Sequence, residues 1–193
     1  MSRHTFAYLF LVSCLSAPSL AQTKTSVGGP ITASTTWTAA NSPYRITSTV
    51  MVQRGATLTI EPGVDVCVQA GLGIRVGATG SAGTIVARGT SARPIRFTSD
   101  AAQPGPGDWD SILLGAQATN GTSFSGCAFE HVTVEYAGSS ALATLQSDQM
   151  VPWIRFCTFR ACASAGVQLN APASRTQPVV VADCVFDSTR SAT

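Results

Sequence analysis

A short phrase made of cysteine, one further residue and phenylalanine occurs three times in the C-terminal third of the chain. The copies read CAFE from Cys127, CTFR from Cys157 and CVFD from Cys184. The middle copy continues as CTFRAC, so that Cys162 follows closely. Two cysteines this near to each other suggest a redox pair or half of a zinc site. A buried cysteine also acts as a small apolar residue, which gives the phrase a purely structural reading.

Two aspartates and one histidine are the other residues whose chemistry draws attention. Asp108 and Asp110 flank Trp109 in the stretch GDWDS. Such a pair can act as the two carboxylates of a glycoside hydrolase or as calcium ligands. His131 stands beside Glu130, but the spacing assigns no serine or cysteine partner to it. We therefore expect His131 to be structural or to face solvent.

Tryptophan is the residue type that stacks most readily on sugar rings. Trp109 and Trp153 are our candidates for carbohydrate binding on this ground. The competing interpretation is that both rings are buried at the edge of a core, where tryptophan is also common. Neither interpretation can be tested without knowing the elements that carry the two residues.

Those elements are predicted to be short β-strands. From Ile31 onward, apolar residues recur in pairs with one residue between them, and glycine, proline, serine or threonine follow each pair. This alternation is typical of strands, whereas the spacing of three and four that builds helices is not sustained anywhere. The pairs include Val50 and Val52, Leu58 and Ile60, Ile74 and Val76, Ile95 and Phe97, and Val132 and Val134.

Repetition of these strand groups predicts how they are arranged. The groups recur about every 20 to 30 residues, which is typical of a solenoid in which one repeat makes one coil. Equivalent residues of successive coils then stack at about 4.8 Å, the separation of neighbouring strands. The stretch AAQPGPGDWD from Ala101 interrupts the spacing, and we interpret it as a loop that leaves the coil.

The chain resembles the right-handed parallel β-helix repeat proteins of bacterial envelopes, within the pectin-lyase-like class. The resemblance rests on GATLTIEPGVDVCV, GLGIRV, TIVARGTSARPIRFTSD, GDWDSILL and FEHVTVEYAG, and it extends from Ile31 to the end. It implies an all-β fold of about six coils for residues 31–193. Members of this class include polysaccharide lyases, glycosidases, epimerases and surface proteins, so the fold does not select a function.

Within such a coil, the three cysteine phrases align into columns. Aligning CAFE, CTFR and CVFD places Cys127, Cys157 and Cys184 at one position, facing inward. Their phenylalanines then form a second inward column, and the next residues form a third column that faces solvent. The phenylalanine column would contain Phe129, Phe159 and Phe186, and the solvent column Glu130, Arg160 and Asp187. We expect the columns to be structural and Cys162, at a turn, to be the one cysteine able to pair sideways with a column cysteine. Zinc is disfavoured because no tight ligand set is complete.

The column of Glu130, Arg160 and Asp187 also has a catalytic interpretation. Lyases of uronic-acid polymers use acidic groups to hold Ca²⁺ against the sugar carboxylate and an arginine as base. Flanking carboxylates raise the pKa of an arginine, however, and this opposes its action as a base. We therefore favour an ion-pair ladder on the surface, and we infer no cofactor, apart from Ca²⁺ if the protein is a lyase.

The first 21 residues are predicted to be a signal peptide. A short basic head is followed by an apolar run from Phe6 to Val12 and by a small-residue exit at Ala21, and the run is too short to span a membrane. An alternative cleavage before Cys14 would leave a lipid on that cysteine. Either route predicts secretion or attachment to the cell envelope. Residues 22–30 are expected to be a short linker.

The composition limits the partners. Only 11% of the residues are charged and the net charge is +2, so no basic patch suited to nucleic acid is expected. The chain stops just after a predicted strand, at DCVFDSTRSAT, and we expect either a missing continuation or another chain stacked on an open coil. The sequence favours an exported surface protein with a structural, adhesive or carbohydrate-binding role. The alternative is a polysaccharide lyase or glycoside hydrolase, either complete or truncated, that acts on extracellular polysaccharide.

Overall fold

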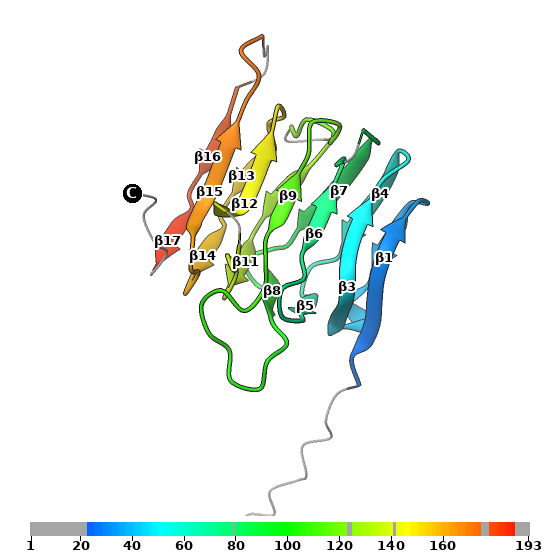
Figure 1. Ribbon diagram of the computed structural model, residues 1–193, viewed down its shortest axis with the longest axis vertical. Coiled ribbons are helices and arrows are strands. Elements are labelled where there is room, and N and C mark those ends of the chain that lie inside the picture. Colours follow the sequence, from blue (N-terminus) through cyan, green and yellow to red (C-terminus); the bar gives the residue numbers. More distant parts are fainter. Residues whose placement is uncertain (1–22, 79, 123–124, 141, 175–177, 188–193) are drawn as a thin grey trace, which may run out of the picture.

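The computed structural model describes residues 23–78, 80–122, 125–140, 142–174 and 178–187 (Figure 1). The predicted signal peptide and Cys14 lie outside these residues. The expected linker over 22–30 is wrong for most of its length, because β1 (Thr25–Ile31) pairs in parallel with β3 (Tyr44–Val52). The one helix among the described residues is the 3-10 turn η1 (Ala39–Asn41). No helix in this part of the chain has the length and apolar character needed to cross a membrane.

The strands form three walls around one core, and the strands within each wall run parallel to one another. Wall 1 consists of the second half of β3, β6 (Ile74–Val76), β9 (Ile112–Leu114), β12 (Ala143–Asp148) and β15 (Ala165–Asn170). Wall 2 consists of the first half of β3, β5 (Asp65–Val68), β8 (Ile95–Ser99), β11 (Val132–Glu135), β14 (Thr158–Arg160) and β17 (Val185–Asp187). Wall 3 consists of β2 (Thr35–Trp37), β4 (Ala56–Ile60), β7 (Gly83–Arg88), β10 (Ala128–Glu130), β13 (Trp153–Arg155) and β16 (Val180–Ala182).

Each coil visits wall 2, wall 1 and wall 3 in turn and then climbs to the next coil. The strands β5, β6 and β7 form one such coil, and β8, β9 and β10 form the next. Every pairing between neighbouring coils is parallel, and Figure 1 shows the coils following one another from the β1 end to the β17 end. The all-β parallel β-helix predicted from the repeats is therefore confirmed.

Inward side chains stack into columns, as the alternation in each strand requires. On wall 2, Val66, Phe97, Val134 and Phe159 occupy one column in consecutive coils, and each is fully or almost fully buried. The ring of Phe159 stacks on that of Phe186 at 5.2 Å between centroids. The column loses its cover at this last described strand, where Phe186 is 48% exposed.

Single residues with positive φ turn the chain from wall 3 into wall 2. His131, Phe156 and Asp183 directly follow β10, β13 and β16, and their φ angles are 47°, 54° and 56°. The amide of His131 donates to the carbonyl of Arg155, and the amide of Phe156 donates to that of Ala182. Ordinary residues rarely adopt this conformation, so the stacked corners are held by the coils above and below.

Candidate functional site

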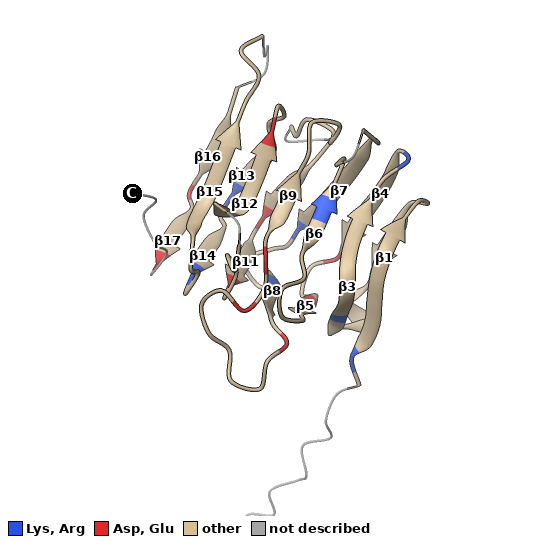
Figure 2. Ribbon diagram, viewed as in Figure 1, with Lys and Arg blue, Asp and Glu red and all other residues tan. Residues whose placement is uncertain are grey.

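Outward positions of wall 2 carry a connected set of polar and charged side chains. Strand register places one outward column along β3, β5, β8, β11, β14 and β17. Its members are Arg45, Cys67, Thr98, Glu135, Arg160 and Asp187. A second outward column begins with Asp65 and Arg96. Figure 2 shows acidic and basic residues along these strands, with further charged residues on other parts of the ribbon.

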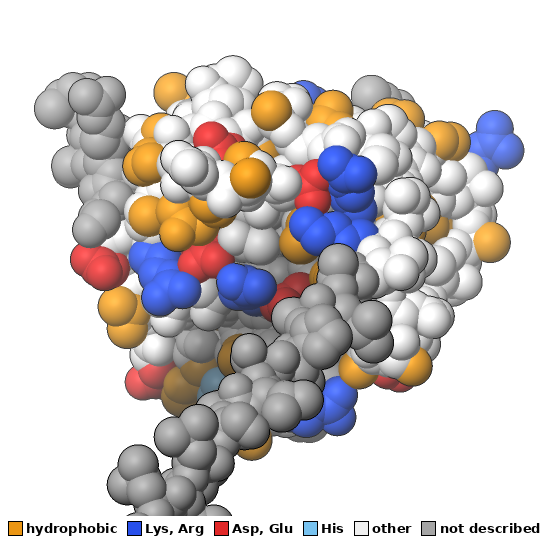
Figure 3. Space-filling model, turned by 90° about the horizontal axis from the view of Figure 1, so that it is seen from below, with side chains coloured by type: hydrophobic (Ala, Val, Ile, Leu, Met, Phe, Trp, Pro, Cys, Tyr) orange, Lys and Arg blue, Asp and Glu red, His pale blue; other side chains and the backbone are white. Residues whose placement is uncertain are grey.

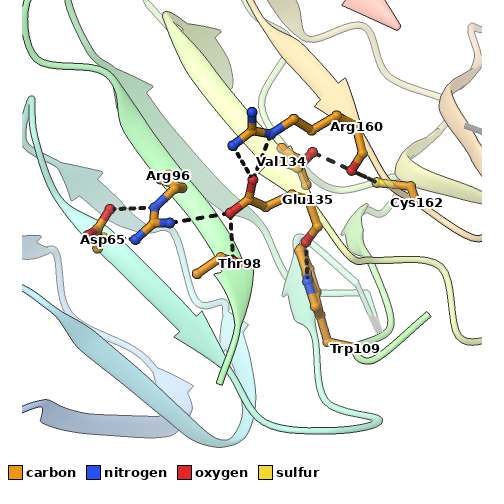
Figure 4. Close-up of polar contacts among 8 residues, drawn as sticks. All are labelled: Asp65, Arg96, Thr98, Trp109, Val134, Glu135, Arg160 and Cys162. Atoms are coloured by element: carbon orange, nitrogen blue, oxygen red, sulfur yellow. Dashed lines mark hydrogen bonds and ion pairs between the residues drawn. The ribbon is translucent and has the colours of Figure 1, made fainter. Parts of the chain in front are cut away.

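Glu135 is at the centre of this surface (Figure 4). Its side chain is only 3% exposed, yet both of its oxygens are occupied. Oε1 accepts from the hydroxyl of Thr98 at 2.8 Å and from Nη1 of Arg96 at 3.4 Å. Oε2 accepts from Nε of Arg160 at 2.8 Å and from Nη2 of the same residue at 2.7 Å. Donors from β8 and β14 therefore occupy both oxygens of this carboxylate.

Arg96 connects Glu135 to the neighbouring column. Its Nε and Nη2 donate to the two oxygens of Asp65 at 3.0 and 3.1 Å, a bidentate pair. The hydrogen bond with Asp65 raises the pKa of Arg96 above its ordinary value, despite partial burial. We call Asp65, Arg96, Thr98, Glu135 and Arg160 the ion-pair network.

Asp100 forms a second ionic contact immediately after β8. Its Oδ1 pairs with Nζ of Lys24 at 2.7 Å and its Oδ2 pairs with Nε of Arg45 at 2.5 Å, and the side chain of Asp100 is 5% exposed. Burial by itself would raise the pKa of this carboxyl, but the hydrogen bonds from Lys24 and Arg45 outweigh burial and lower it. Because Lys24 is 76 positions away in sequence, Asp100 attaches the first described residues to wall 2.

A hollow opens beside Asp100. It has a volume of about 430 Å³ and is lined by Gln69, Ala70, Ser99, Asp100, Ala101 and Asp108. Asp108 accepts from the hydroxyl of Ser99 at 2.6 Å and from the amide of Gly105 at 3.0 Å, so it shapes the loop over the hollow. Figure 3 looks onto this side of the molecule and shows blue and red side chains interleaved on it. The hollow and the ion-pair network together form the candidate site.

The predicted loop between β8 and β9 is confirmed, and Trp109 fastens its end. The indole of Trp109 is fully buried and donates from Nε1 to the carbonyl of Glu135 at 2.8 Å (Figure 4). A buried ring offers no face to a sugar, so the carbohydrate-binding role considered for Trp109 is wrong. The structure instead gives this residue the alternative role at the edge of the core.

The two aspartates beside Trp109 do not share partners. Asp108 faces the hollow, whereas Asp110 accepts from Ser140 at 2.8 Å and lies 3.6 Å from Arg75 of wall 1. Each carboxylate is thus held by its own set of neighbours. The paired-carboxylate interpretation of GDWDS therefore has no support in the geometry.

The alignment of the three cysteine phrases is wrong for its first member. Cys127 precedes β10, which lies in wall 3 and pairs with β7 and β13, so Phe129 stands beside Ala87 and Ile154. Cys157 and Cys184 precede β14 and β17 of wall 2, and their phenylalanines do share a column. The same three letters thus begin strands on two different walls.

Glu130, which the alignment placed in the same column as Arg160, therefore lies on wall 3. It lies beside Arg88 and Arg155 in register, not beside Arg160, and it pairs with Arg88 Nη1 at 2.5 Å. It also accepts from Nε1 of Trp153 at 2.7 Å. Trp153 is half-buried, with the guanidinium of Arg155 5.9 Å from its ring centroid.

His131 occupies the corner after β10 and stacks on Phe156, with ring centroids 4.8 Å apart and planes within 9°. The guanidinium of Arg155 lies 4.7 Å from the centre of the Phe156 ring on the same corner. Among the described residues, the ring contact of His131 is with Phe156, which is not a nucleophile. The histidine therefore forms part of the stacked turn. Its expected structural role agrees with this position.

Glu135 is the residue that the sequence alignment missed. In register, Val132, Thr133, Val134 and Glu135 stand one coil before Cys157, Thr158, Phe159 and Arg160, so Glu135 takes the place assigned to Glu130. The signal was present in the alternation of VTVE, which matches CTFR position by position when apolar residues are aligned. The shared cysteine and phenylalanine drew the alignment to CAFE instead.

A family model described as a pectate-lyase-like β-helix domain matches residues 29–147. This match covers β3 to β11 in full and therefore includes the hollow and Glu135. No curated protein matches the chain, and no solved structure does.

Proposed function

The chain belongs to the family of pectate-lyase-like β-helix domains, and we propose that it is an exported protein that binds polysaccharide along wall 2 without cleaving it. The observation that carries the proposal is the layering of the candidate site. Carboxylates lie beneath and guanidinium groups lie outside: Glu135 and Asp100 are 3% and 5% exposed, whereas Arg45, Arg96 and Arg160 are 43 to 52% exposed.

Such layering suits a polyhydroxylated ligand. An arginine has five N–H donors in a fixed plane, and a buried carboxylate holds that plane in position. Arg45 donates from Nε to Asp100, and its side chain is 43% exposed. Because cation and anion are paired throughout, the surface presents donors with little net charge. Binding should therefore depend on hydroxyl geometry more than on ionic attraction.

The hollow supplies the concavity that flat surfaces lack. Its volume of about 430 Å³ lies in the range of small-ligand sites, and its lining includes the hydroxyl of Ser99 and the carboxylates of Asp100 and Asp108. It lies at the end of β8, directly beside Thr98 and the ion-pair network. A polysaccharide lying along the coils can place one sugar unit in the hollow while the adjacent sugar units contact the arginines.

A cleaving role, the alternative that the sequence left open, has less support. A general acid or base needs a carboxyl group that can exchange a proton with the substrate. The carboxylates of the candidate site are instead engaged by Lys24, by arginines or by loop donors. Asp108 and Asp110, the residues first considered for hydrolysis, have separate partners.

Calcium also fits the site poorly. Ca²⁺ requires six to eight oxygen ligands, several of them carboxylates. Around the hollow, Asp100 already contacts two cationic side chains, and Glu135 contacts two arginines. Among the residues that the structure describes, no group of three histidine, cysteine or acidic side chains could hold a metal ion. The proposed binding is accordingly independent of calcium.

The proposal is tested by affinity electrophoresis in gels containing neutral or uronic-acid polysaccharides, with Ca²⁺ or with a chelator. The double variant Arg96→Gln and Arg160→Gln replaces two charged guanidinium groups with shorter, neutral amides that have fewer donors. We expect it to lose at least about tenfold in affinity for the polymer that retards the wild type, which corresponds to about 1.4 kcal/mol. Arg75→Gln is the matched control, because Arg75 is also about half exposed and paired with an aspartate, but lies on wall 1.

Two outcomes would contradict the proposal. Equal retardation of the wild type and the double variant would remove wall 2 from the binding surface. Shortening of the polymer during incubation would show cleavage, and new ultraviolet absorbance from unsaturated sugar ends would identify that activity as a lyase. Cleavage would direct attention to Asp108 and to the carboxylates of the network as candidate catalytic groups.

Export is part of the same proposal and is supported by the leader sequence. We propose cleavage after Ala21, with lipid attachment at Cys14 as the alternative. Expression of the full chain followed by N-terminal sequencing and mass measurement of the processed protein distinguishes the two. A first residue of Gln22 supports simple secretion, and a lipidated Cys14 supports anchoring.

A structural role by stacking is the second candidate function. The last described strands leave apolar side chains uncovered, with Val181, Val185 and Phe186 39 to 55% exposed. A further coil or another chain that adds strands next to β16 and β17 would cover them. Light scattering over a range of concentrations tests association, and Phe186→Lys should abolish it. A monomeric wild type at all concentrations would oppose assembly through this end.

A further inference from the structure

Cys157 and Cys184 meet at the corner between wall 3 and wall 2. Each immediately precedes a strand, β14 or β17, and these two strands are paired with Thr158 opposite Val185. The amide of Val185 donates to the carbonyl of Cys157 at 2.8 Å, which fixes the register at the cysteines themselves. The thiols occupy equivalent places, because Sγ of Cys157 lies 3.2 Å from the carbonyl oxygen of Arg155 and Sγ of Cys184 lies 3.2 Å from that of Ala182, the residue in register with Arg155. Cys157 is 1% exposed, and Cys184 is only partly buried.

The other described cysteines are placed differently. Cys162 follows β14 at its opposite end and directs its thiol to the carbonyls of Val134 and Arg160. The three residues of β14 that separate it from Cys157 span about 10 Å, which is beyond the reach of a disulfide. The sideways pairing of Cys162 with Cys157 that the sequence left open is therefore excluded by the strand between them. Cys127 and Cys67 lie on wall 3 and at the middle of β5.

We propose that Cys157 and Cys184 are a disulfide-forming site that joins the last described coil to the coil beneath it. Neighbouring parallel strands are about 4.8 Å apart, which lies inside the range of Cα separations found in disulfides. The β-carbons must approach by about 1 Å, since bridged cysteines have them near 3.8 Å apart. β17 can make this movement because, among the described strands, β14 is its sole neighbour.

The two thiols have complementary roles in the reaction. The neighbouring Cys157 thiol lowers the pKa of Cys184 below its ordinary value, whereas the pKa of Cys157 is raised, so Cys184 is the thiol of the pair that ionises first. Its partial exposure lets it attack an external disulfide and form a mixed disulfide while one external thiol leaves. Cys157 then loses its proton and attacks the Cys184 sulfur, and the second external thiol leaves. Two protein thiols are thus oxidised and one external disulfide is reduced.

The bond would fasten the coil whose cover is least complete. β17 carries the exposed Val185 and Phe186 and is held by three register pairs with β14. A covalent link at the start of this strand limits its separation from β14 when the coil opens. We expect the oxidised protein to melt roughly 5 °C higher than the reduced protein.

The test uses the purified, reduced chain and oxidised glutathione at neutral pH. After an acid quench, free thiols are alkylated in denaturant and the intact mass is measured. We expect the wild type to lose two hydrogens and to yield, after proteolysis without reduction, one linked pair of peptides that contains Cys157 and Cys184. Cys67→Ser, a change outside the pair, should lose two hydrogens as the wild type does.

Single variants report the order of the steps. Cys157→Ser should trap glutathione on Cys184, because the attacking thiol remains and the resolving thiol is absent. Cys184→Ser should leave Cys157 unmodified and free for alkylation. A persistent glutathione adduct on Cys184 of the wild type, or a linkage between any other two cysteines, would overturn the proposal. The wild-type measurement stands by itself if a variant does not fold, and none of these readouts depends on polysaccharide binding.

Discussion

Replacing Glu135 by glutamine removes one charge from the centre of the ion-pair network and changes little else. The amide keeps an oxygen for the Thr98 hydroxyl, so the loss falls on Arg160 and Arg96. A hydrogen bond to a charged group contributes about 1.5 to 3 kcal/mol, compared with about 0.5 to 1.5 kcal/mol between neutral groups. Arg160 provides two short contacts, so the change costs about 2 kcal/mol before solvent is considered.

Solvent reduces that figure, because both arginines are about half exposed and regain water. We therefore expect the free energy of unfolding to fall by about 1 to 2 kcal/mol, equivalent to about 2 to 8 °C in Tm for a chain of this size. Urea denaturation followed by far-ultraviolet circular dichroism measures the change. The midpoint should move without a change in slope.

Asp183→Asn is the matched control for this prediction. Asp183 also pairs with an arginine, Arg155, at 2.9 Å, but its side chain is 52% exposed. Asparagine tolerates the positive φ of this corner, so only the charge is lost. An exposed pair contributes about 0 to 1 kcal/mol. If Glu135→Gln costs no more than Asp183→Asn, burial does not strengthen the network and the reasoning about its carboxylate fails.

Other perturbations have equally definite outcomes. Phe159→Ala should cost about 3 to 5 kcal/mol because its ring is buried, whereas Phe186→Ala, in the same column, should cost under about 1 kcal/mol; equal losses in urea titrations would contradict the column. The pKa of the Asp100 carboxyl is lowered by folding, so its charged form contributes stability above pH 3.8, the ordinary pKa of the group, and this contribution is lost as the pH falls through the lowered pKa. The free energy of unfolding of Asp100→Asn should therefore differ from that of the wild type at neutral pH and converge with it in acid. Burial raises the pKa of Cys127 to about 11, so native alkylation at pH about 8 should be far slower at Cys127 than at Cys184, as peptide mass mapping would show.

The fold could be predicted from sequence because its signal is repeated. Alternating pairs such as Val50 and Val52 or Ile95 and Phe97 indicate β-strands, and their recurrence along the chain predicts the stacked coils. Each copy supports the others, so an error in one strand does not change the architecture. Fastening of the loop by Trp109, by contrast, depends on the carbonyl of Glu135 on another strand, which no local pattern specifies.

The position of the site could not be predicted in the same way. Cys127 and Cys157 each occupy a corner position that requires a small buried residue, and each is followed two residues later by an inward phenylalanine. This local requirement is the same on wall 3 and on wall 2. A coil with three walls offers more than one place for the same phrase. Only the strand pairing, which is a long-range property, separates Glu130 from Glu135.

The corner formed by His131 has a consequence for how such a chain can change in length. One residue alone joins β10 to β11 there, and it is stacked directly on Phe156 of the next corner. An added residue would shift β11 by one position, turning Val134 outward and Glu135 into the core. The loop after Asp100 has no such restriction, because its residues pair with no strand of a neighbouring coil until Trp109. Insertions and deletions are therefore expected in that loop, whereas the corners must keep a constant length.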